Sequence, residues 1–536
     1  MADLAPREVT PPIIQVPSAK EKKYDRQLRL WAASGQRALE ESHVLLVVGD
    51  DKAGSNSSVA GVETLKNLVL PSIGNFTIAD SSIVTEADLG VNFFLDPQSL
   101  HKSRAEEATR FLSELNPDVT GHSITLPLSE WLPVQDSLKP FNLILLAAPI
   151  PQEPLQRLAS YALKSSIPLI YLQSAGFYAS FSIQLPSAFP IVDTHPDPET
   201  TQDLRLLAPW PELDAAVDSL GDITLLSDHD HGHIPYILLL LYHLREWKNS
   251  HDGTYPSDYK QKSAFRDLVR SAARTANPEG GEENYDEAAA AVLKTIAPPP
   301  IGSGCKELFS MDHTNNLHPD SSNFWIIANA VKTFYEKHTV LPLPGTLPDM
   351  KATSEQYIKL QNIYKSKARH DVAEVKQYVS VNIESLGRST PVPDAEIESF
   401  CKNASHVRVL TNENHDSIPV LRLFEKDPKI IKSLQSHVEN DWEGLLPIFI
   451  ALNSTNGNPP PFHIEELTTD VEVLDNMTKA IQEVQRVGGG ELHNISSVLG
   501  GMVAQESIKL LTRQYVPVDG TCVFDGIRSK TAVVKF

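Results

Sequence analysis

Three glycines and two aspartates follow the first strongly apolar segment of the chain, "VLLVV", and precede the helical pattern "ETLKNL". Glycines between a buried strand and a helix are typical of loops that bind phosphate through backbone N–H groups. Gly49 and Gly61 stand at the two ends of this connection, with Gly54 between them. However, the connection is about twice as long as that fingerprint allows, and Asp50 and Asp51 would set negative charge against a phosphate. The pattern therefore favours an ordinary strand–helix junction over a phosphate site.

The segments around this junction alternate between strand and helix patterns up to about residue 173. Apolar runs separated by helical periods are typical of a parallel sheet that is covered on both faces. Strands are expected in "VLLVV", "NFTIAD", "FNLILLAA" and "PLIYLQ", and helices in "KSRAEEATRFLSELN" and "EPLQRLASYALKSS". The pattern predicts a doubly wound, Rossmann-like α/β domain.

This α/β domain is expected to be split in sequence by a long, mostly helical insertion. After the insertion, "NISSVLGGMVAQESIKLL" predicts a helix, and "GTCVFDG" and "KTAVVKF" predict a hairpin of two short strands. Ser497, Gly500, Gly501 and Ala504 give that helix a small-residue face, which would let another backbone approach closely. The expected organisation is a flexible tail at 1–17, the first part of the α/β domain at 18–174, the insertion at 175–487 and the final part of the α/β domain at 488–536.

The composition limits the possible classes of function. The chain has 536 residues and a formal net charge of −21, which argues against binding of nucleic acid or anionic membranes, because both need a basic face. No apolar run has the length of a transmembrane helix, so we expect no membrane insertion. Cys305, Cys401 and Cys522 lie far apart, which argues against a zinc site or a disulfide framework and indicates the cytoplasm or nucleus.

Several longer motifs resemble one known family. "YDRQLRLW", "LKNLVLPSIGNFTIAD", "NFFL", "ELNPDV" and "LGGMVAQESIKLL" are similar to the ThiF/MoeB-like adenylation fold of ubiquitin-type activating enzymes. The closest resemblance is to the regulatory, catalytically silent subunits of neddylation-activating enzymes. It continues through the insertion in "HIPYILLLLYHLREW", "LPGTLPDM" and "YIKLQNIYKSKA", and so covers nearly the whole chain after the tail.

The resemblance implies which residues would bind a nucleotide in an active member, where ATP and magnesium serve to adenylate a ubiquitin-like protein. Asp80 stands at the position of the ribose-binding aspartate. The other positions depart from the pattern, because Val91 replaces the phosphate-binding arginine, Arg104 the lysine and Pro149 the magnesium-linked aspartate. Arginine keeps the charge of lysine but not its compact geometry, and without a carboxylate the metal has no obvious protein anchor. We therefore expect no cofactor bound by this chain, with ATP and magnesium held by the partner subunit.

The resemblance also implies that two adenylation folds pair and that the silent one completes the site of its partner. Arg26, in "YDRQLRLW", matches the arginine that does so, with Arg29 one helical turn later. An arginine is always charged and can bridge two phosphate oxygens, so in trans it would stabilise charge as the acyl-adenylate forms. The alternative is a solvated helix arginine that pairs with Asp25 or a glutamate.

Three further features have competing interpretations. Cys305 follows a glycine-rich segment, but no histidine or basic cluster adjoins it to lower its pKa. We expect no thioester cysteine here, and in the resembled family the partner subunit carries it. The cluster "DHDHGH" could bind zinc, but it begins an apolar helix, where Asp and His more often act as caps. The apolar segment Leu341, Pro342, Leu343 and Pro344 either docks on a partner with little ordering cost or covers the core of its own domain.

The sequence thus predicts the regulatory half of a heterodimeric activating enzyme for a ubiquitin-like modifier, obligately paired with a catalytic subunit. Three alternatives stay open: a self-sufficient homodimeric adenylating enzyme, the silent half of another modifier's activating enzyme, and an adaptor for a receptor or ligase. ATP–pyrophosphate exchange by the chain alone would favour the first alternative.

Overall fold

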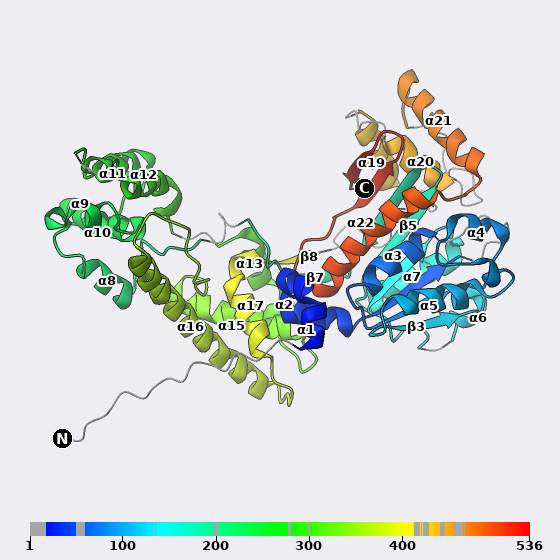
Figure 1. The fold of residues 1–536 in the computed structure, drawn as a ribbon, viewed down its shortest axis with the longest axis horizontal. Coiled ribbons are helices and arrows are strands. Elements are labelled where there is room, and N and C mark those ends of the chain that lie inside the picture. Colours follow the sequence, from blue (N-terminus) through cyan, green and yellow to red (C-terminus); the bar gives the residue numbers. More distant parts are fainter. Residues whose placement is uncertain are drawn as a thin grey trace. The chain divides into compact units, whose positions relative to one another are not determined.

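The protein is described here by a computed structural model (Figure 1). The residues that the structure describes are 18–49, 59–134, 136–197, 202–276, 280–298, 301–411, 428–439, 445–454 and 467–535, together with Pro419, Leu421 and Glu465. They belong to two units: Met1–Phe189 with Thr411–Phe536 form the first, and Pro190–Leu410 form the second. The expected split of one domain by an insertion is thus present.

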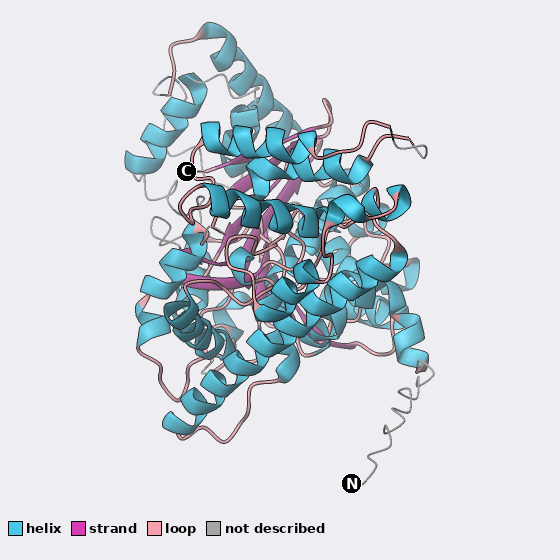
Figure 2. Cartoon of the chain, turned by 90° about the vertical axis from the view of Figure 1, so that its left-hand side faces the viewer, coloured by secondary structure: helices cyan, strands magenta, loops and turns pink. Residues whose placement is uncertain are grey.

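An eight-stranded sheet forms the centre of the first unit, and its strands are among those coloured magenta in Figure 2. The strand order is β10-β9-β6-β5-β4-β1-β2-β3. The five strands from β5 to β3 in this order are parallel to one another, whereas the pairs β5–β6, β6–β9 and β9–β10 are antiparallel. The strands are β1 (His43–Val48), β2 (Asn75–Ala79), β3 (Thr120–Ile124), β4 (Leu143–Ala147), β5 (Leu169–Ala175), β6 (Tyr178–Gln184), β9 (Thr521–Asp525) and β10 (Lys530–Val534). The predicted α/β fold and the C-terminal hairpin are confirmed.

Helices cover both faces of this sheet because successive side chains of a strand point to opposite sides. Leu45 and Val47 of β1 pack in one cluster with Leu155 of α7, on one face. Leu46 points to the other face, where a Cβ added to Gly61 of α3 would lie 2.7 Å from the Leu46 side chain. The helices of this unit are α1 (Ala19–Lys23), α2 (Asp25–Glu40), α3 (Val59–Val69), α4 (Glu86–Val91), α5 (Arg104–Leu115), α6 (Leu128–Trp131), α7 (Gln152–Lys164), α19 (Pro428–Glu439), α20 (Leu445–Ser454), α21 (Val471–Val487) and α22 (His493–Thr512).

The small-residue face of α22 packs directly against α3. A Cβ added to Gly500 would lie 2.7 Å from Cβ of Glu63 and 2.9 Å from the backbone nitrogen of Thr64. The predicted close approach of another backbone is therefore confirmed at Gly500. A Cβ added to Gly501 would meet nothing within 4 Å, so that glycine is not needed for packing.

The second unit is mostly helical and has its own apolar core, in which Ile237, Leu240, Phe265 and Tyr364 are almost fully buried. Its helices are α8 (Pro211–Asp218), α9 (Asp228–His231), α10 (Tyr236–Ser250), α11 (Tyr259–Ser271), α12 (Glu283–Thr295), α13 (Ser303–Ser310), α14 (Asp312–Asn315), α15 (Asn323–His338), α16 (Ser354–Ser385) and α17 (Asp394–Lys402). A two-stranded sheet pairs β7 (Ala188–Val192) with β8 (Val407–Thr411).

The second unit is shorter than the insertion expected at 175–487. Helices α20 and α21, which fall within that range, contribute Phe449 and Met477 to a core cluster with Tyr178 of β6 and Val523 of β9. They therefore cover part of the sheet of the first unit. Helical periodicity predicted these helices correctly, but it carries no information on which core they bury.

None of the helices in the described ranges is both long and apolar enough to cross a membrane.

Candidate functional site

The first glycine of the candidate phosphate loop serves the packing of the chain itself. Gly49 follows β1, and a Cβ added to it would lie 1.7 Å from the carbonyl oxygen of Pro149, which follows β4. The two strands are paired in parallel, with Val48 opposite Ala147, so the chain beyond β4 passes directly over Gly49. A glycine is required for this approach whether or not a phosphate is near. Asp50, Asp51 and Gly54 lie outside the described residues.

A carboxylate of the chain lies at the N-terminal end of α3. The backbone N–H groups of Val59 and Ala60 donate to the side chain of Glu491 over 2.8 and 3.1 Å. Ser496 donates its hydroxyl to the same carboxylate over 3.0 Å, and Glu491 is only 8% exposed. The positive end of a helix stabilises an anion, and here the anion is a protein side chain.

The segment before α22 holds Glu491 in this position. Gly176, between β5 and β6, donates its N–H to the carbonyl of Gly490 over 2.9 Å, and it forms a parallel bridge with Glu491. Gly176 has a φ of 54°, and a Cβ on it would approach Val487 to 3.0 Å. The turn between β5 and β6 thus holds the backbone of Glu491 in the position from which its carboxylate reaches α3. Sequence reasoning missed Glu491, because it is 432 residues from Val59 and no local motif links them.

The aspartate at the ribose position is neutralised by a buried arginine. Arg104 donates from Nε and Nη2 to the two carboxylate oxygens of Asp80, at 2.6 and 3.2 Å. Its Nη1 donates to Asp88 over 2.9 Å, and all three side chains are at least 95% buried. Burial alone would lower the pKa of Arg104, but the two carboxylates outweigh it and raise the pKa above its ordinary value. Asp80 also accepts the N–H of Ser82 over 2.9 Å and so caps the turn that follows β2.

Arg104 is therefore placed differently from a phosphate-binding lysine. It is the first residue of α5, and its guanidinium turns back to Asp80, which follows β2. A buried ion pair is costly to break, because separation leaves an uncompensated charge. We infer that neither Arg104 nor Asp80 is available to a nucleotide.

The two remaining positions offer no charged group. Val91 ends α4, and its carbonyl oxygen lies 3.1 Å from Nδ1 of His493 at the start of α22. The ring of His493 stacks on Phe93, with centroids 3.7 Å apart. Pro149 presents its carbonyl to Gly49 and has no carboxylate for a metal. Of the described residues at these four positions, none offers an unpaired cation for a phosphate or an unpaired carboxylate for a metal ion.

Arg26 lies in the first turn of α2 and is exposed. Its neighbour Arg29 pairs with Asp25 over 2.9 Å, so the ion pair considered for Arg26 is made by Arg29 instead. Within the described ranges, Arg26 has no ion-pair partner. The helix is anchored on either side by Tyr24, which is 2% exposed, and Trp31, which is 8% exposed. Arg26 is thus a free cation on a firmly held helix.

The apolar segment at 341–344 lies partly in the core of its own unit. Leu343 is 1% exposed and belongs to the main cluster of the second unit, and its N–H donates to the carboxylate of Asp371 in α16 over 3.0 Å. Arg205 donates to the carbonyl of Leu341. Pro342 is also buried, whereas Leu341 and Pro344 are partly exposed, so a role in a partner interface stays a prediction for those two.

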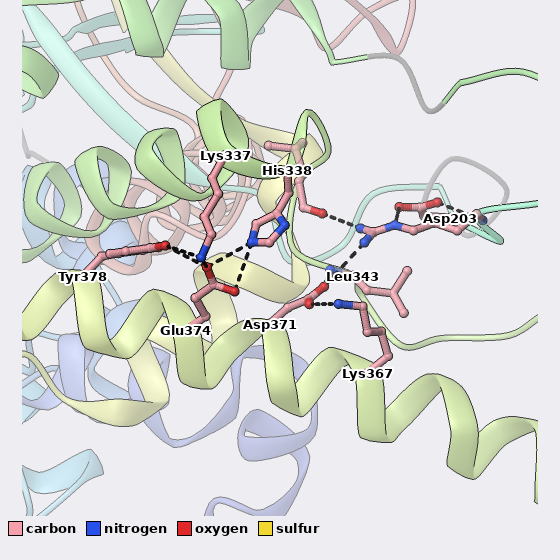
Figure 3. A network of polar contacts seen from close by, with 10 residues as sticks. Asp203, Lys337, His338, Leu343, Lys367, Asp371, Glu374 and Tyr378 are labelled. Atoms are coloured by element: carbon pink, nitrogen blue, oxygen red, sulfur yellow. Dashed lines mark hydrogen bonds and ion pairs between the residues drawn. The ribbon is translucent and has the colours of Figure 1, made fainter. Parts of the chain in front are cut away.

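A cluster of polar side chains around Glu374 of α16 holds the C-terminal end of α15, which lies just before the segment 341–344. Figure 3 shows Lys337 and His338 of α15 pointing toward Glu374 of α16, with Tyr378 on the other side of the carboxylate. Lys337 and Tyr378 donate to Glu374 over 2.8 and 2.7 Å, and Nε2 of His338 lies 2.9 Å from it. Together with Asp371, these contacts attach the end of α15 and the following segment to one face of α16.

The three cysteine thiols are buried, and their surroundings disfavour the thiolate form. Burial raises the pKa of Cys305 to about 12, that of Cys401 to about 12 and that of Cys522 to about 11. The nucleophile of a thioester-forming site is the thiolate, and these groups hold their protons at neutral pH.

One histidine of the cluster, His231, is buried in the second unit, whereas His229 is exposed. Ser227 caps α9, and His231 is buried between Glu282 and Tyr285, at 2.8 and 2.9 Å. Among the described residues no group of His, Cys, Asp or Glu side chains has a geometry able to hold a metal ion.

The chain is similar to known proteins along nearly its whole length. A model of the ThiF family matches residues 24–535. The NEDD8-activating enzyme E1 regulatory subunit of Xenopus laevis is 35% identical over 97% of this chain and 99% of the relative. The subunit of Danio rerio is 34% identical over 96% and 98% of the two chains, and the regulatory subunit AXR1 of Arabidopsis thaliana is 32% identical over 96% of each. The chain therefore belongs to the ThiF family and, within it, to the NEDD8-activating enzyme E1 regulatory subunits.

Proposed function

We propose that this chain is the regulatory half of a heterodimeric NEDD8-activating enzyme and that its own adenylation fold holds no nucleotide. The observation that carries the proposal is the carboxylate of Glu491 at the N-terminus of α3, where it accepts the N–H groups of Val59 and Ala60. In a nucleotide-binding fold such N–H groups face a phosphate. A carboxylate and a phosphate cannot accept the same two hydrogen bonds, and their charges repel.

The catalytic partner subunit then holds ATP, magnesium and the thioester-forming cysteine, and it activates the ubiquitin-like modifier. The pairing of Asp80 with Arg104 and the proline at position 149 support this division of labour, as do the raised pKa values of the three thiols. The two subunits form an obligate pair in the cytoplasm or nucleus, with a large and mostly apolar interface.

Arg26 is the residue by which this chain enters the chemistry of its partner. It is exposed on α2 and has no ion-pair partner in the described part of the chain, while the helix itself is anchored by Tyr24 and Trp31. A guanidinium delivered from outside can stabilise the charge that develops on the phosphates during adenylation. We expect it to reach the ATP phosphates of the partner subunit.

Exchange of labelled pyrophosphate into ATP tests the division of labour. The purified chain alone should give no exchange in the presence of ATP, magnesium and NEDD8, and the reconstituted heterodimer should give it. Exchange by the chain alone would contradict the proposal and favour a self-sufficient adenylating enzyme.

The matched pair Arg26→Ala and Arg29→Ala tests the in-trans role in the reconstituted heterodimer. Arg26→Ala should slow exchange at least about tenfold, because a transition-state charge loses its partner, while Arg29→Ala should stay within about twofold, because it removes only an exposed ion pair. Gel filtration of both variants with the partner separates loss of catalysis from loss of assembly. Equal rates for the two variants would show that Arg26 has no part in the chemistry.

A further inference from the structure

A groove opens in the second unit between the N-terminus of α8 and one face of α16. Its volume is about 590 Å³. The residues that line it come from these two helices and from the residue before α8; they are Trp210, Pro211, Glu212, Lys359, Asn362, Ile363, Ser366, Lys367 and His370. The α16 residues follow one another at intervals of one or three, so they form a continuous stripe along the helix.

The polar side chains of this stripe are free to bind a ligand. Lys359, Asn362, Ser366 and His370 are exposed, and none of them has a hydrogen-bond or ion-pair partner within the described part of the chain. Lysines elsewhere on the same helix are paired, as Lys376 is with two carboxylates at 2.9 Å. In the groove, Lys367 pairs with Asp371 over 2.6 Å.

The α16 wall of the groove carries Lys359, Lys367 and His370 and no aspartate or glutamate. The chain as a whole has a net charge of −21. A local positive potential attracts an anionic partner.

The opposite wall of the groove is apolar. Trp210 is 7% exposed and packs edge-on against Tyr364, with ring centroids 5.0 Å apart. The buried Tyr364 ring therefore holds the Trp210 side chain in place. Ile363 lies partly buried on the α16 side, and Pro211 begins α8. Glu212 is the one carboxylate in the lining, and it places the anionic part of a ligand on the α16 side.

We propose that this groove binds an extended acidic peptide segment of a partner protein, with one apolar side chain against Trp210 and Ile363 and carboxylates toward Lys359 and His370. The stripe from Lys359 to His370 spans about 16 Å at the helical rise, which matches about five residues of extended chain. The free amide of Asn362 and hydroxyl of Ser366 lie between the two cationic ends and can bond to the peptide backbone. This role is separate from the adenylation fold and from Arg26.

Fluorescence anisotropy with the full chain tests the proposal. The probe is a fluorescein-labelled heptapeptide of glutamate and aspartate with one central phenylalanine, at low ionic strength, where charge complementarity contributes most. The unaltered chain should bind it. Lys359→Glu, which lines the groove, should weaken binding at least about tenfold, which is about 1.4 kcal/mol.

Lys365→Glu is the matched control, because Lys365 is exposed on the same helix and does not line the groove. It makes the same change of charge and should alter affinity by no more than about twofold. A peptide with alanine in place of phenylalanine should bind at least about fivefold more weakly if the apolar wall takes part.

Four outcomes would overturn the proposal: no binding of the peptide, equal losses for Lys359→Glu and Lys365→Glu, equal affinity for the alanine peptide, or Lys359-dependent binding of phosphatidylserine vesicles without binding of the peptide. The circular dichroism spectra of both variants should match that of the unaltered chain, since both side chains are exposed on the helix.

Discussion

Glu491 and Arg104 turn the candidate nucleotide site into a self-contained set of ion pairs and helix caps. Glu491 accepts hydrogen bonds from the first N–H groups of α3. Arg104 pairs with the buried carboxylates of Asp80 and Asp88. Without these contacts, the N–H groups and the carboxylates would be buried without a partner. Because an unsatisfied buried polar group costs free energy, these contacts make the site stable without a ligand. A fold that is stable in this way can lose its nucleotide without losing its structure.

Replacement of Glu491 tests this structural role. Glu491→Gln keeps an acceptor oxygen but removes the charge at the positive end of α3, so we expect the free energy of unfolding to fall by about 0.5–2 kcal/mol. The measurement is the midpoint of urea unfolding of the full chain. Glu483→Gln, which removes only a surface ion pair with Arg486, should change it much less. Equal midpoints for Glu491→Gln and the unaltered chain would contradict the cap.

For single residues, the sequence predicted which residue types stand at the candidate nucleotide site but not which contacts they make. Asp80, Val91, Arg104 and Pro149 could be assigned from local motifs, and their types led to the prediction that this chain binds no nucleotide. That Arg104 turns back to Asp80 depends on the burial of both, which no local pattern encodes. Glu491 could not be predicted at all, since its partner helix begins 432 residues earlier in the chain.

Helices α22 and α3 of the first unit pack closely together at Gly500. Gly500 is needed there, since a Cβ would lie 2.7–2.9 Å from the backbone and Cβ atoms of α3. Gly500→Ala should lower the free energy of unfolding by about 1–3 kcal/mol through overpacking. Gly501→Ala, one residue on and with nothing within 4 Å, should be neutral or stabilise by about 0.5–1 kcal/mol, because alanine favours a helix. Thermal unfolding of the two variants checks this, and similar melting temperatures would contradict the assigned packing.

The attachment of α15 to α16 should depend on pH through Glu374. Burial raises the pKa of Glu374, but hydrogen bonds from Lys337, Tyr378 and His338 outweigh it and lower the pKa from 4.5 to about 2. A carboxyl whose pKa is lower in the folded state contributes stability that is fully present above its unfolded pKa and is lost as the pH falls toward its folded pKa. We expect Glu374→Gln to lower the melting temperature at pH 7, with the difference from the unaltered chain shrinking as the pH falls from about 5 to 3.

The control for this pH dependence is Glu398→Gln, which removes an exposed ion pair with Lys376. It should give a small difference at every pH. A difference for Glu374→Gln that stays constant with pH would mean that the carboxylate charge does not hold the two helices together.

Helices and strands could be predicted from the local sequence pattern of each segment. The unit to which a helix belongs could not be predicted in this way. The strands of the sheet and the C-terminal hairpin follow from apolar runs and turn residues. Helices α20 and α21 were also recognised as helices, yet they pack on Tyr178 and Val523 of the sheet rather than in the insertion. Which core an amphipathic helix covers depends on contacts far away in sequence.

For the whole molecule, we propose that a pair of adenylation folds binds one nucleotide. The first unit keeps the doubly wound sheet and makes internal contacts at the N-terminus of α3, and in this proposal the chemistry belongs to the partner subunit. Family membership over nearly the full length of the chain supports this assignment. The second unit adds a basic groove that an acidic partner segment can use independently.

Isothermal titration calorimetry with ATP and magnesium tests the central claim most directly. The isolated chain should give no binding heat, and the reconstituted heterodimer should bind one ATP per pair. Stoichiometric binding of ATP to the isolated chain, or two ATP molecules per heterodimer, would contradict the account.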